Sequence, residues 1–257
     1  MMPSPDTFPV PLIHINETNS TNNYLQSLCS EQKVEELTVV VADFQTSGRG
    51  QRGNSWESDP GKNLLFSTVI FPEFLEARRQ FLISQVISLA IKEELDTYTT
   101  DISIKWPNDI VIHGKKVCGI LTEMSTQMDY INYIVIGIGI NVQNESFPEE
   151  IGEVATSLRI ESGKKQNRAA IIEAVWEEFE KYYDIYLKTE DMQGLVGEYD
   201  QKLANMNKQV RVLDPKDPYE GTARGITPKG ELIVDTWEAR KLVSSGEVSV
   251  RGLYGYV

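Results

Sequence analysis

The chain has 257 residues, of which 40% are hydrophobic, and this is enough for one large domain with a core and one small domain. A disordered or fibrous protein is therefore excluded. The net charge of -13 argues against sequence-independent nucleic-acid binding, because the average surface repels phosphate backbones. Since neither a signal peptide nor a run of about 18 apolar residues occurs, we expect a soluble, cytoplasmic protein with no membrane or nucleic-acid partner.

Cysteine and histidine are too few for several kinds of site. Cys29 and Cys118 are the only cysteines and lack CxxC spacing, so we expect reduced thiols. His14 and His113 form neither HxxH nor HExxH, which leaves little material for a histidine metal site or a Ser/His/Asp triad. Chemistry must therefore come from arginine, lysine, asparagine, aspartate and backbone groups.

Short strands and helices alternate along the first two hundred residues. Asn19, Ser20 and Thr21 are good N-caps for the first helix, and Gly114-Lys115 is expected to close a hairpin. The apolar residues at helical spacing in the helix expected at 169–187 are predicted to pack in the core. Hydrophobic periodicity predicts strands at 10–15, 37–44, 63–71, 102–106, 109–113, 117–124 and 130–142, and helices at 22–32, 78–95 and 169–187.

The pattern changes near residue 207. Pro- and Gly-containing turns separate about five short strands, which is typical of a small all-β barrel. These strands are expected at 208–214, 219–227, 230–236, 239–245 and 247–253. We therefore predict two domains, residues 1–206 and residues 207–257. No helix-turn-helix fits before residue 10.

The strongest local signal is a Gly/Arg loop, Gly48-Arg49-Gly50-Gln51-Arg52-Gly53, which leaves the end of a predicted strand. Its glycines allow backbone N–H groups to turn toward an anion, and two arginines add charge-assisted bonds to phosphate or carboxylate. The loop is neither a Walker A motif nor a GxGxxG fingerprint. It is interpreted as an anion cradle, and a solvated surface loop is the alternative.

Two further motifs place polar side chains at strand ends. Pro107 makes Lys105-Trp106-Pro107-Asn108-Asp109 a rigid turn that can present Asn108 and Asp109 together, although both are ordinary turn residues. Gly137 and Gly139 allow a ligand or backbone to approach the strand that ends in Asn141, and an ordinary bulge explains this pattern equally well.

Lys116 enters an apolar strand. Alternation predicts that Lys116, Cys118 and Ile120 share one face, where a charge usually has an anionic partner. The alternative is a lysine at a hairpin end that extends to water.

Together these motifs resemble the biotin protein ligase family, which belongs to a superfamily that also contains lipoate protein ligases. The matching stretches keep the order and spacing of that family and span most of the chain: STNNYL (20–25), FQTSGRGQRGNSW (44–56), KWPNDIVIHGKKVCGIL (105–121), GIGINV (137–142) and GEVSVR (246–251). The resemblance implies an α+β fold, with a mixed β-sheet catalytic domain like the class II synthetases and biotin–lipoate ligases, flanking helices, and a C-terminal SH3-like β-barrel. It indicates the monofunctional type, without an N-terminal DNA-binding domain.

The resemblance also implies roles for individual residues. Lys116 and Arg49 would be catalytic. The biotin site would be lined by Ser20, Thr21, Asn22, Gln45, Gly48, Arg49, Gly50, Gln51, Lys116 and Gly119. ATP would be held by Arg52, Trp56, Asn108, Asp109, Asn141 and Arg251. Many family members have arginine where this chain has Gln51, so Gln51 and Arg52 are both open as the residue that retains the adenylate. The residues that coordinate Mg²⁺ are not assigned.

The implied reaction has two steps, adenylation of biotin by ATP with Mg²⁺ and transfer of biotin to a lysine of a biotin carboxyl carrier protein domain. Enzymes of this kind act chiefly by alignment and charge neutralisation, and no covalent nucleophile is needed. A homodimer is a further expectation. Two alternatives stay open, a lipoate or octanoate ligase of the same superfamily and, more distantly, a non-catalytic biotin-responsive repressor.

Overall fold

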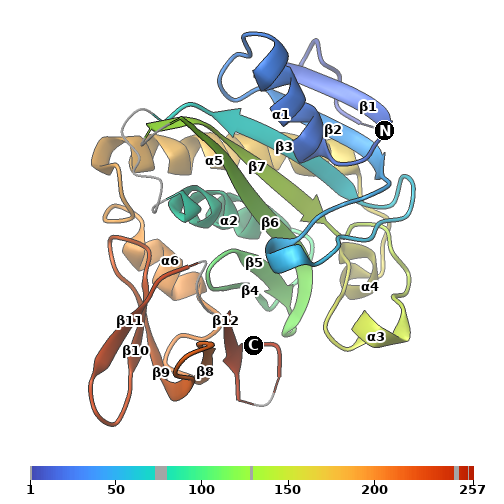
Figure 1. The fold of residues 1–257 in the computed structure, drawn as a ribbon. Coiled ribbons are helices and arrows are strands. Elements are labelled where there is room, and N and C mark those ends of the chain that lie inside the picture. The colour runs from blue at the N-terminus through green and yellow to red at the C-terminus, as the bar shows by residue number, and fades with distance from the viewer. Residues whose placement is uncertain (1, 73–79, 128–129, 246–248, 254) are drawn as a thin grey trace.

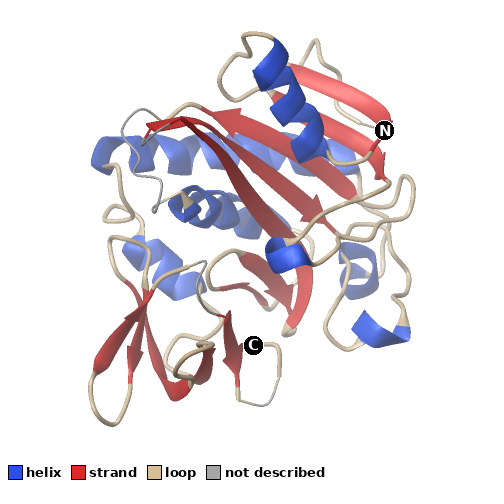
Figure 2. Cartoon of the chain, in the orientation of Figure 1, coloured by secondary structure: helices blue, strands red, loops and turns tan. Residues whose placement is uncertain are grey.

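The fold contains two β-sheets, one large and mixed, one small and antiparallel. A computed structural model describes residues 2–72, 80–127, 130–245, 249–253 and 255–257. Figure 1 shows the large sheet with helices on both faces and the small sheet packed beside its β4 edge. Figure 2 shows the strands of the two sheets in red and the helices that flank the larger sheet in blue. The expected combination of a mixed sheet with flanking helices and a second, C-terminal sheet is confirmed.

The large sheet has the strand order β1-β2-β3-β7-β6-β5-β4. β1 and β2 are parallel and every other neighbouring pair is antiparallel. Its central strands carry few charges because both faces are covered. The strands are β1 (Leu12–Thr18), β2 (Val39–Gln45), β3 (Leu64–Ile70), β4 (Ile102–Lys105), β5 (Asp109–Ile112), β6 (Lys115–Gln127) and β7 (Tyr130–Ile140).

Helices cover the two faces of this sheet unequally. On one face lies α1 (Thr21–Glu31), whose Leu25 packs against Val40, Val69 and Val135. On the other face α2 (Phe81–Leu95) and α5 (Arg168–Thr189) enclose the main core (Figure 1). The apolar stripe expected in the last helix is buried, as predicted, at Ile172, Val175, Trp176, Phe179, Tyr183 and Tyr186. The start of α1 borders a cavity on this face of the sheet.

The small sheet has the strand order β11-β10-β9-β8-β12 and is connected through α6 (Val196–Lys202). Its strands are β8 (Gln209–Leu213), β9 (Tyr219–Ile226), β10 (Leu232–Asp235), β11 (Arg240–Val243) and β12 (Ser249–Gly252). It is fixed to the large domain at Gly230, whose carbonyl accepts bonds from Trp106 Nε1 at 3.0 Å and Gln85 Nε2 at 2.8 Å. The domain boundary at 206/207 and a closed SH3-like barrel stay predictions.

Most expected elements appear with shifted ends, but the hairpin turn lies one residue earlier than expected. His113 and Gly114 form the turn with φ of 48° and 77°, and Lys115 already belongs to β6. Residues 78, 79, 247 and 248 of two expected elements lie outside the described residues. Periodicity did not reveal α6, η1 (Gln51–Gly53), α3 (Glu149–Gly152) or α4 (Leu158–Ser162), because these helices are too short to show it.

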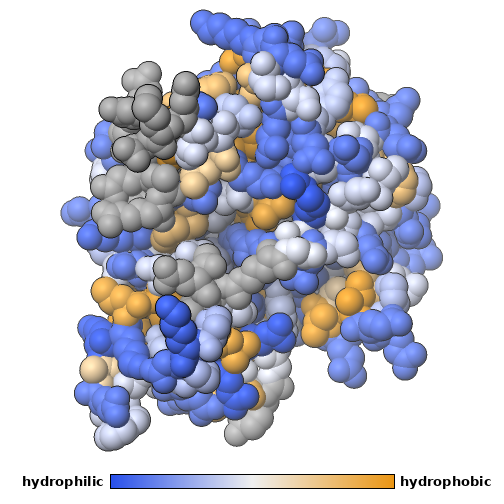
Figure 3. All heavy atoms as spheres, in the orientation of Figure 1, coloured by the Kyte–Doolittle hydropathy of each residue, from blue (hydrophilic) through white to orange (hydrophobic). Residues whose placement is uncertain are grey.

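The surface seen in Figure 3 is mostly hydrophilic. In the view of Figure 3, hydrophilic side chains cover most of the surface and hydrophobic ones form small separate groups. Both cysteines are unpaired. Within the described part of the chain, no helix has the length and apolar character needed to cross a bilayer.

Candidate active site

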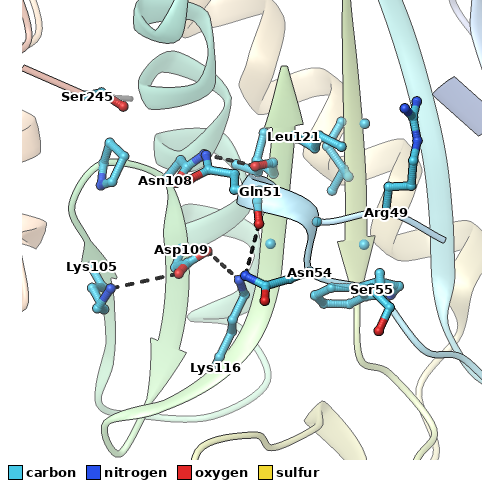
Figure 4. Close-up of a pocket in the computed structure, with 18 of the residues that line it drawn as sticks. Arg49, Gln51, Asn54, Ser55, Lys105, Asn108, Asp109, Lys116, Leu121 and Ser245 are labelled. Atoms are coloured by element: carbon cyan, nitrogen blue, oxygen red, sulfur yellow. Dashed lines mark hydrogen bonds and ion pairs between the residues drawn. The ribbon is translucent and has the colours of Figure 1, made fainter. Parts of the chain in front are cut away.

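A cavity of about 230 Å³ opens on the α1 face of the large sheet. Its walls come from the start of α1, the loop 49–56, β5, β6, β7 and the end of the small sheet domain, as Figure 4 shows for part of the lining. The structure therefore brings together segments that are far apart in the sequence. Predicted residues that line it are Ser20, Thr21, Asn22, Gln45, Arg49, Gly50, Gln51, Trp56, Asn108, Asp109, Lys116, Gly119 and Arg251.

The cavity floor is built from glycines on two paired strands. Gly139 pairs with Gly119, and Gly137 pairs with Leu121. A Cβ on Gly139 would lie 2.5 Å from Trp56 Cε2, and one on Gly137 would overlap Asn22 Oδ1. The indole and the amide thus lie directly on the sheet, which no other residue at these positions would allow. The close approach expected at Gly137 and Gly139 is made by side chains of this chain.

A β-bulge determines which way Lys116 points. The register between β5 and β6 shifts so that Ile110 pairs with Cys118 while Val111 pairs with Lys116. Val117 and Cys118 are both fully buried in the core, whereas the Lys116 side chain lies against Gly119 on the cavity face. The prediction that Lys116 shares a face with Cys118 and Ile120 is therefore wrong, because strict alternation fails at a bulge. The prediction of an anionic partner for Lys116 is confirmed.

That partner is Asp109. Lys116 Nζ lies 2.7 Å from Asp109 Oδ1, and Lys105 Nζ lies 4.0 Å from Asp109 Oδ2, as the dashed lines of Figure 4 show. Tyr256, from the C-terminal segment, donates its hydroxyl to the same carboxylate, and its ring centroid lies 4.4 Å from Lys105 Nζ. Arg251 also lines this end. Positive charge is therefore concentrated around one carboxylate.

The charges of this cluster shift the pKa values of its members. Burial alone would raise the pKa of Asp109, but Lys116 and Lys105 outweigh it and hold the pKa below its ordinary value. Burial lowers the pKa of Lys105, with Asp109 opposing and Lys116 and Arg251 adding to the decrease. The cavity end thus holds an ionised aspartate beside cations that it only partly neutralises. An added anion, such as a phosphate, would complete the charge balance.

The opposite end of the cavity is a network of uncharged polar groups. Gln45 Oε1 accepts bonds from Thr21 N at 2.7 Å and from Thr21 Oγ1 at 3.1 Å. Ser67 Oγ donates to Asn22 Oδ1 at 2.6 Å and lies within hydrogen-bond distance of Thr21 Oγ1 at 2.7 Å. Ser20 occupies the N-cap position without a capping bond from its side chain, and Gln45 accepts from the first amide of α1. This end can recognise a neutral group with several donors and acceptors.

The Gly/Arg loop is a small hairpin that covers one side of the cavity. Gly50 N donates to Asn54 O at 2.7 Å and Trp56 N donates to Gly48 O at 2.9 Å. Two backbone N–H groups of this segment are therefore already used in hydrogen bonds within it. Arg49 Nη2 lies 2.6 Å from Glu123 Oε2. Figure 4 shows the Arg49 guanidinium pointing away from Lys116 and Asp109. The cations Arg49 and Lys116 therefore do not converge in this structure. Gln51 begins η1, and the Arg52 side chain lies outside the described part.

Two of the predicted site residues lie outside this cavity, in an adjoining hollow. Gly48 and Asn141 line that hollow, which shares Gln45, Trp56 and Lys116 with the cavity. Asn141 Nδ2 donates to Thr156 O at 3.1 Å, which fixes the amide toward the 156 loop. Within the cavity, Asn108 is similarly tied, because its Nδ2 donates to Ile120 O at 2.9 Å. Both asparagines therefore hold strand ends in place.

Sequence reasoning missed four residues that complete the site, namely Lys105, Ser67, Glu123 and Tyr256. Lys105 is the first residue of the 105–109 turn, and its charge could have indicated a role in the site. Ser67 is a polar residue in a fully buried strand, and Glu123 is a charge in a predicted strand, which are weak signals. Tyr256 lies 147 positions from Asp109, and no local pattern could have revealed that contact.

Known proteins match most of the chain. A model of the biotin/lipoate A/B protein ligase family matches residues 15–141, and a model of the biotin protein ligase C-terminal domain matches residues 206–251. The bifunctional ligase/repressor BirA of Bacillus subtilis (strain 168) is 35% identical over 243 residues, which are 93% of this chain and 74% of the relative. The chain belongs to the biotin protein ligase family.

Other members of the family support the same assignment. The biotin–[acetyl-CoA-carboxylase] ligase of Mycobacterium tuberculosis is 27% identical over 239 residues, 91% of this chain and 86% of the relative. A solved biotin protein ligase from Aquifex aeolicus, in complex with biotin and ATP, covers 94% of this chain and 98% of its own with a TM-score of 0.82 and 32% identity. The resemblance seen in the sequence motifs is confirmed, and the chain is an enzyme of the ligase class. The roles of single residues stay predictions.

Proposed function

We propose that this biotin protein ligase activates biotin with ATP to biotinyl-5'-AMP and transfers biotin to a lysine of a biotin carboxyl carrier protein domain. The observation that carries the proposal is the polarity of the cavity. A neutral hydrogen-bonding network lies at one end, a glycine floor lies in the middle, and the Lys116–Asp109 pair lies at the other end. Biotin has the matching order of groups, a ureido ring, an alkyl chain and a carboxylate.

The uncharged end suits the ureido ring. Ser20, Thr21 and Asn22 are buried, and Gln45 brings both an acceptor and a donor on one amide. A ureido group offers two N–H donors and one carbonyl acceptor, so it can both donate hydrogen bonds to these side chains and accept hydrogen bonds from them. We assign Gln45 and the start of α1 to the head group, with the Asn22 amide, which lies on Gly137, as part of its pocket.

The charged end suits the reacting carboxylate and the α-phosphate. Lys116 is held by Asp109, and Lys105 and Arg251 add positive charge nearby. The nucleotide would extend toward Trp56 and the hollow lined by Asn141. Within the described residues no three histidine, cysteine or acidic side chains gather as metal ligands. Mg²⁺ would enter as the substrate MgATP, since Mg²⁺ in nucleotide sites is bound largely by phosphates.

In the first step, a biotin carboxylate oxygen attacks the α-phosphorus of ATP, and the bond from that phosphorus to the pyrophosphate oxygen breaks. The approaching groups are both anionic, so the enzyme must neutralise charge and align the atoms. Lys116 is placed to do both, because Asp109 and the bulge fix its direction. Arg49 would contribute after leaving its position beside Glu123.

In the second step, the carrier lysine amine attacks the acyl carbon of biotinyl-AMP, and the acyl carbon–oxygen bond breaks to release AMP. The amine loses a proton and becomes an amide nitrogen. Negative charge develops on the carbonyl oxygen and on the departing phosphate, and Lys116 can stabilise both. The loop 48–56 would shield the adenylate from water while the carrier approaches.

Adenylate formation tests this function directly. The purified protein is incubated with MgATP and biotin, and pyrophosphate release and biotinyl-AMP are measured in parallel reactions with lipoate and octanoate. We expect pyrophosphate release to depend on biotin and not on the other acids. Release with lipoate or octanoate alone would instead assign the chain to the lipoate branch of the superfamily.

Two expectations concern the whole protein. A homodimer stays a proposal, which sedimentation equilibrium with and without biotin and ATP tests. The repressor alternative requires DNA binding that responds to biotin, and a gel-shift assay with biotin and ATP examines it. Adenylate formation without any DNA binding would agree with the ligase proposal.

A further inference from the structure

A single carboxylate, Glu123, collects the donors that surround the uncharged end of the cavity. Arg49 Nη2 lies 2.6 Å from Glu123 Oε2, Asn22 Nδ2 lies 2.8 Å from it, and Gln26 Nε2 lies 3.3 Å from it. Three donors on one oxygen form a strong local network. The side chain of Glu123 is 25% exposed and that of Arg49 is 42% exposed, so water reaches the pair from the loop side.

The position of Glu123 along its strand explains this arrangement. Along β6, Lys116, Gly119 and Leu121 line the cavity, and Glu123 follows just beyond the lining residues. Arg49 pairs with Glu123, and Asn23 Oδ1 also accepts from Arg49 Nη2 at 2.6 Å. As a result the loop 48–53 is bound through Arg49 to α1 and β6, and Arg49 does not contact Lys116.

From this geometry we infer that Glu123 is a positioning residue that holds Arg49 in the ligand-free enzyme and competes with the substrate anion for it. The inference rests on the proposed function, in which Arg49 acts on the biotin carboxylate or the α-phosphate. Arg49 has its charge satisfied by Glu123 before substrate arrives. When the anion binds, it takes over this role, the ion pair breaks, and the loop is released to close. Glu123 thus sets an energetic threshold for closure.

The magnitude of this threshold follows from the exposure of the pair. Ion pairs that water reaches are worth little, so the competition should change apparent substrate affinity by about two- to fivefold. The direction of the change in substrate affinity distinguishes a competing counter-ion from a supporting residue. A residue that merely supports the cavity makes substrate bind more weakly when it is replaced, whereas a competing counter-ion makes substrate bind more tightly when its charge is removed.

Glu123→Gln tests the inference, because it keeps the shape and removes the charge. Glu17→Gln, at an exposed position of β1, is the matched control for the same change in net charge. The ligand-free proteins are digested with trypsin, and cleavage after Arg49 or Arg52 is quantified by mass spectrometry. We expect E123Q to be cut in this loop several times faster than wild type or E17Q. Equal rates of loop cleavage would overturn the inference without reference to any substrate.

The second arm measures KM and kcat for biotin and for MgATP in pyrophosphate release. We expect E123Q to lower KM for biotin, for MgATP or for both by about two- to fivefold, with kcat changed by less than KM. Glu123→Asp, which retains the charge, should move KM back toward the wild-type value. A raised or unchanged KM for both substrates in E123Q would contradict the competition. If wild type itself formed no adenylate, the proposed function would fail instead.

Discussion

Lys116 and Asp109 form an ion pair of 2.7 Å across neighbouring strands, and the β-bulge at Val117 is what allows it. Without the extra residue, Lys116 would point into the core with Cys118. The bulge turns the ammonium to the cavity face and leaves Val117 and Cys118 buried. A local irregularity of one strand therefore places the cation on which the proposed chemistry depends.

Replacing Lys116 by alanine should abolish adenylate formation while the fold stays intact. The loss should exceed about a hundredfold in kcat/KM, since the variant removes the cation placed at the reacting carboxylate and phosphate. Biotin-dependent pyrophosphate release is the measurement, and circular dichroism checks the fold. Lys115→Ala is the matched control, because Lys115 Nζ lies near Gly152 O and Lys115 does not line the cavity. Near-normal release by K116A would refute the role.

The depressed pKa of Asp109 predicts how stability depends on pH. A carboxylate with a folded-state pKa below its unfolded value of about 3.9 contributes stability above that value and loses it as pH falls through the folded pKa. Asp109→Asn should therefore unfold at lower urea than wild type by a difference that is constant from pH 7 to about pH 4.5 and shrinks only below. If the difference already shrinks between pH 7 and 5, the folded-state pKa of Asp109 is raised, which contradicts the charge cluster described above.

Adding one methyl group to the floor should disturb the nucleotide side of the cavity. In Gly139→Ala the new Cβ would lie 2.5 Å from Trp56 Cε2, so the indole must move. We expect KM for MgATP to rise about fivefold or more, which corresponds to an overpacking cost of about 1 to 3 kcal/mol. Gly197→Ala in α6 meets nothing within 4 Å and serves as the control. Unchanged KM values in G139A would show that Trp56 and the floor do not define the nucleotide site.

The C-terminal segment should contribute to catalysis through Tyr256. Tyr256→Phe removes the hydroxyl that donates to Asp109 but keeps the ring 4.4 Å from Lys105 Nζ. We expect kcat for pyrophosphate release to fall about three- to tenfold in Y256F, and further in Y256A, which also loses the cation–π contact. Activity of both variants equal to that of wild type would exclude Tyr256 from the reaction.

Local patterns predicted the parts of the site that a single segment carries. The Gly/Arg loop, the 105–109 turn and the glycines of β7 were identified because their composition is unusual for a loop or a strand. The direction of Lys116 could not be predicted, because a bulge changes the period of the strand without a composition signal. The contacts of Tyr256 with Asp109 and of Glu123 with Arg49 join residues that only the tertiary fold brings together.

The central claim is that the protein joins biotin to a carrier lysine, and label transfer tests it most directly. The protein is incubated with MgATP, biotin and a biotin carboxyl carrier domain, and the carrier is probed with streptavidin. The same carrier with its acceptor lysine replaced by arginine is the control. We predict labelling of the intact carrier that requires both ATP and biotin and is absent with K116A. No label on a carrier that another biotin protein ligase does modify would contradict the account.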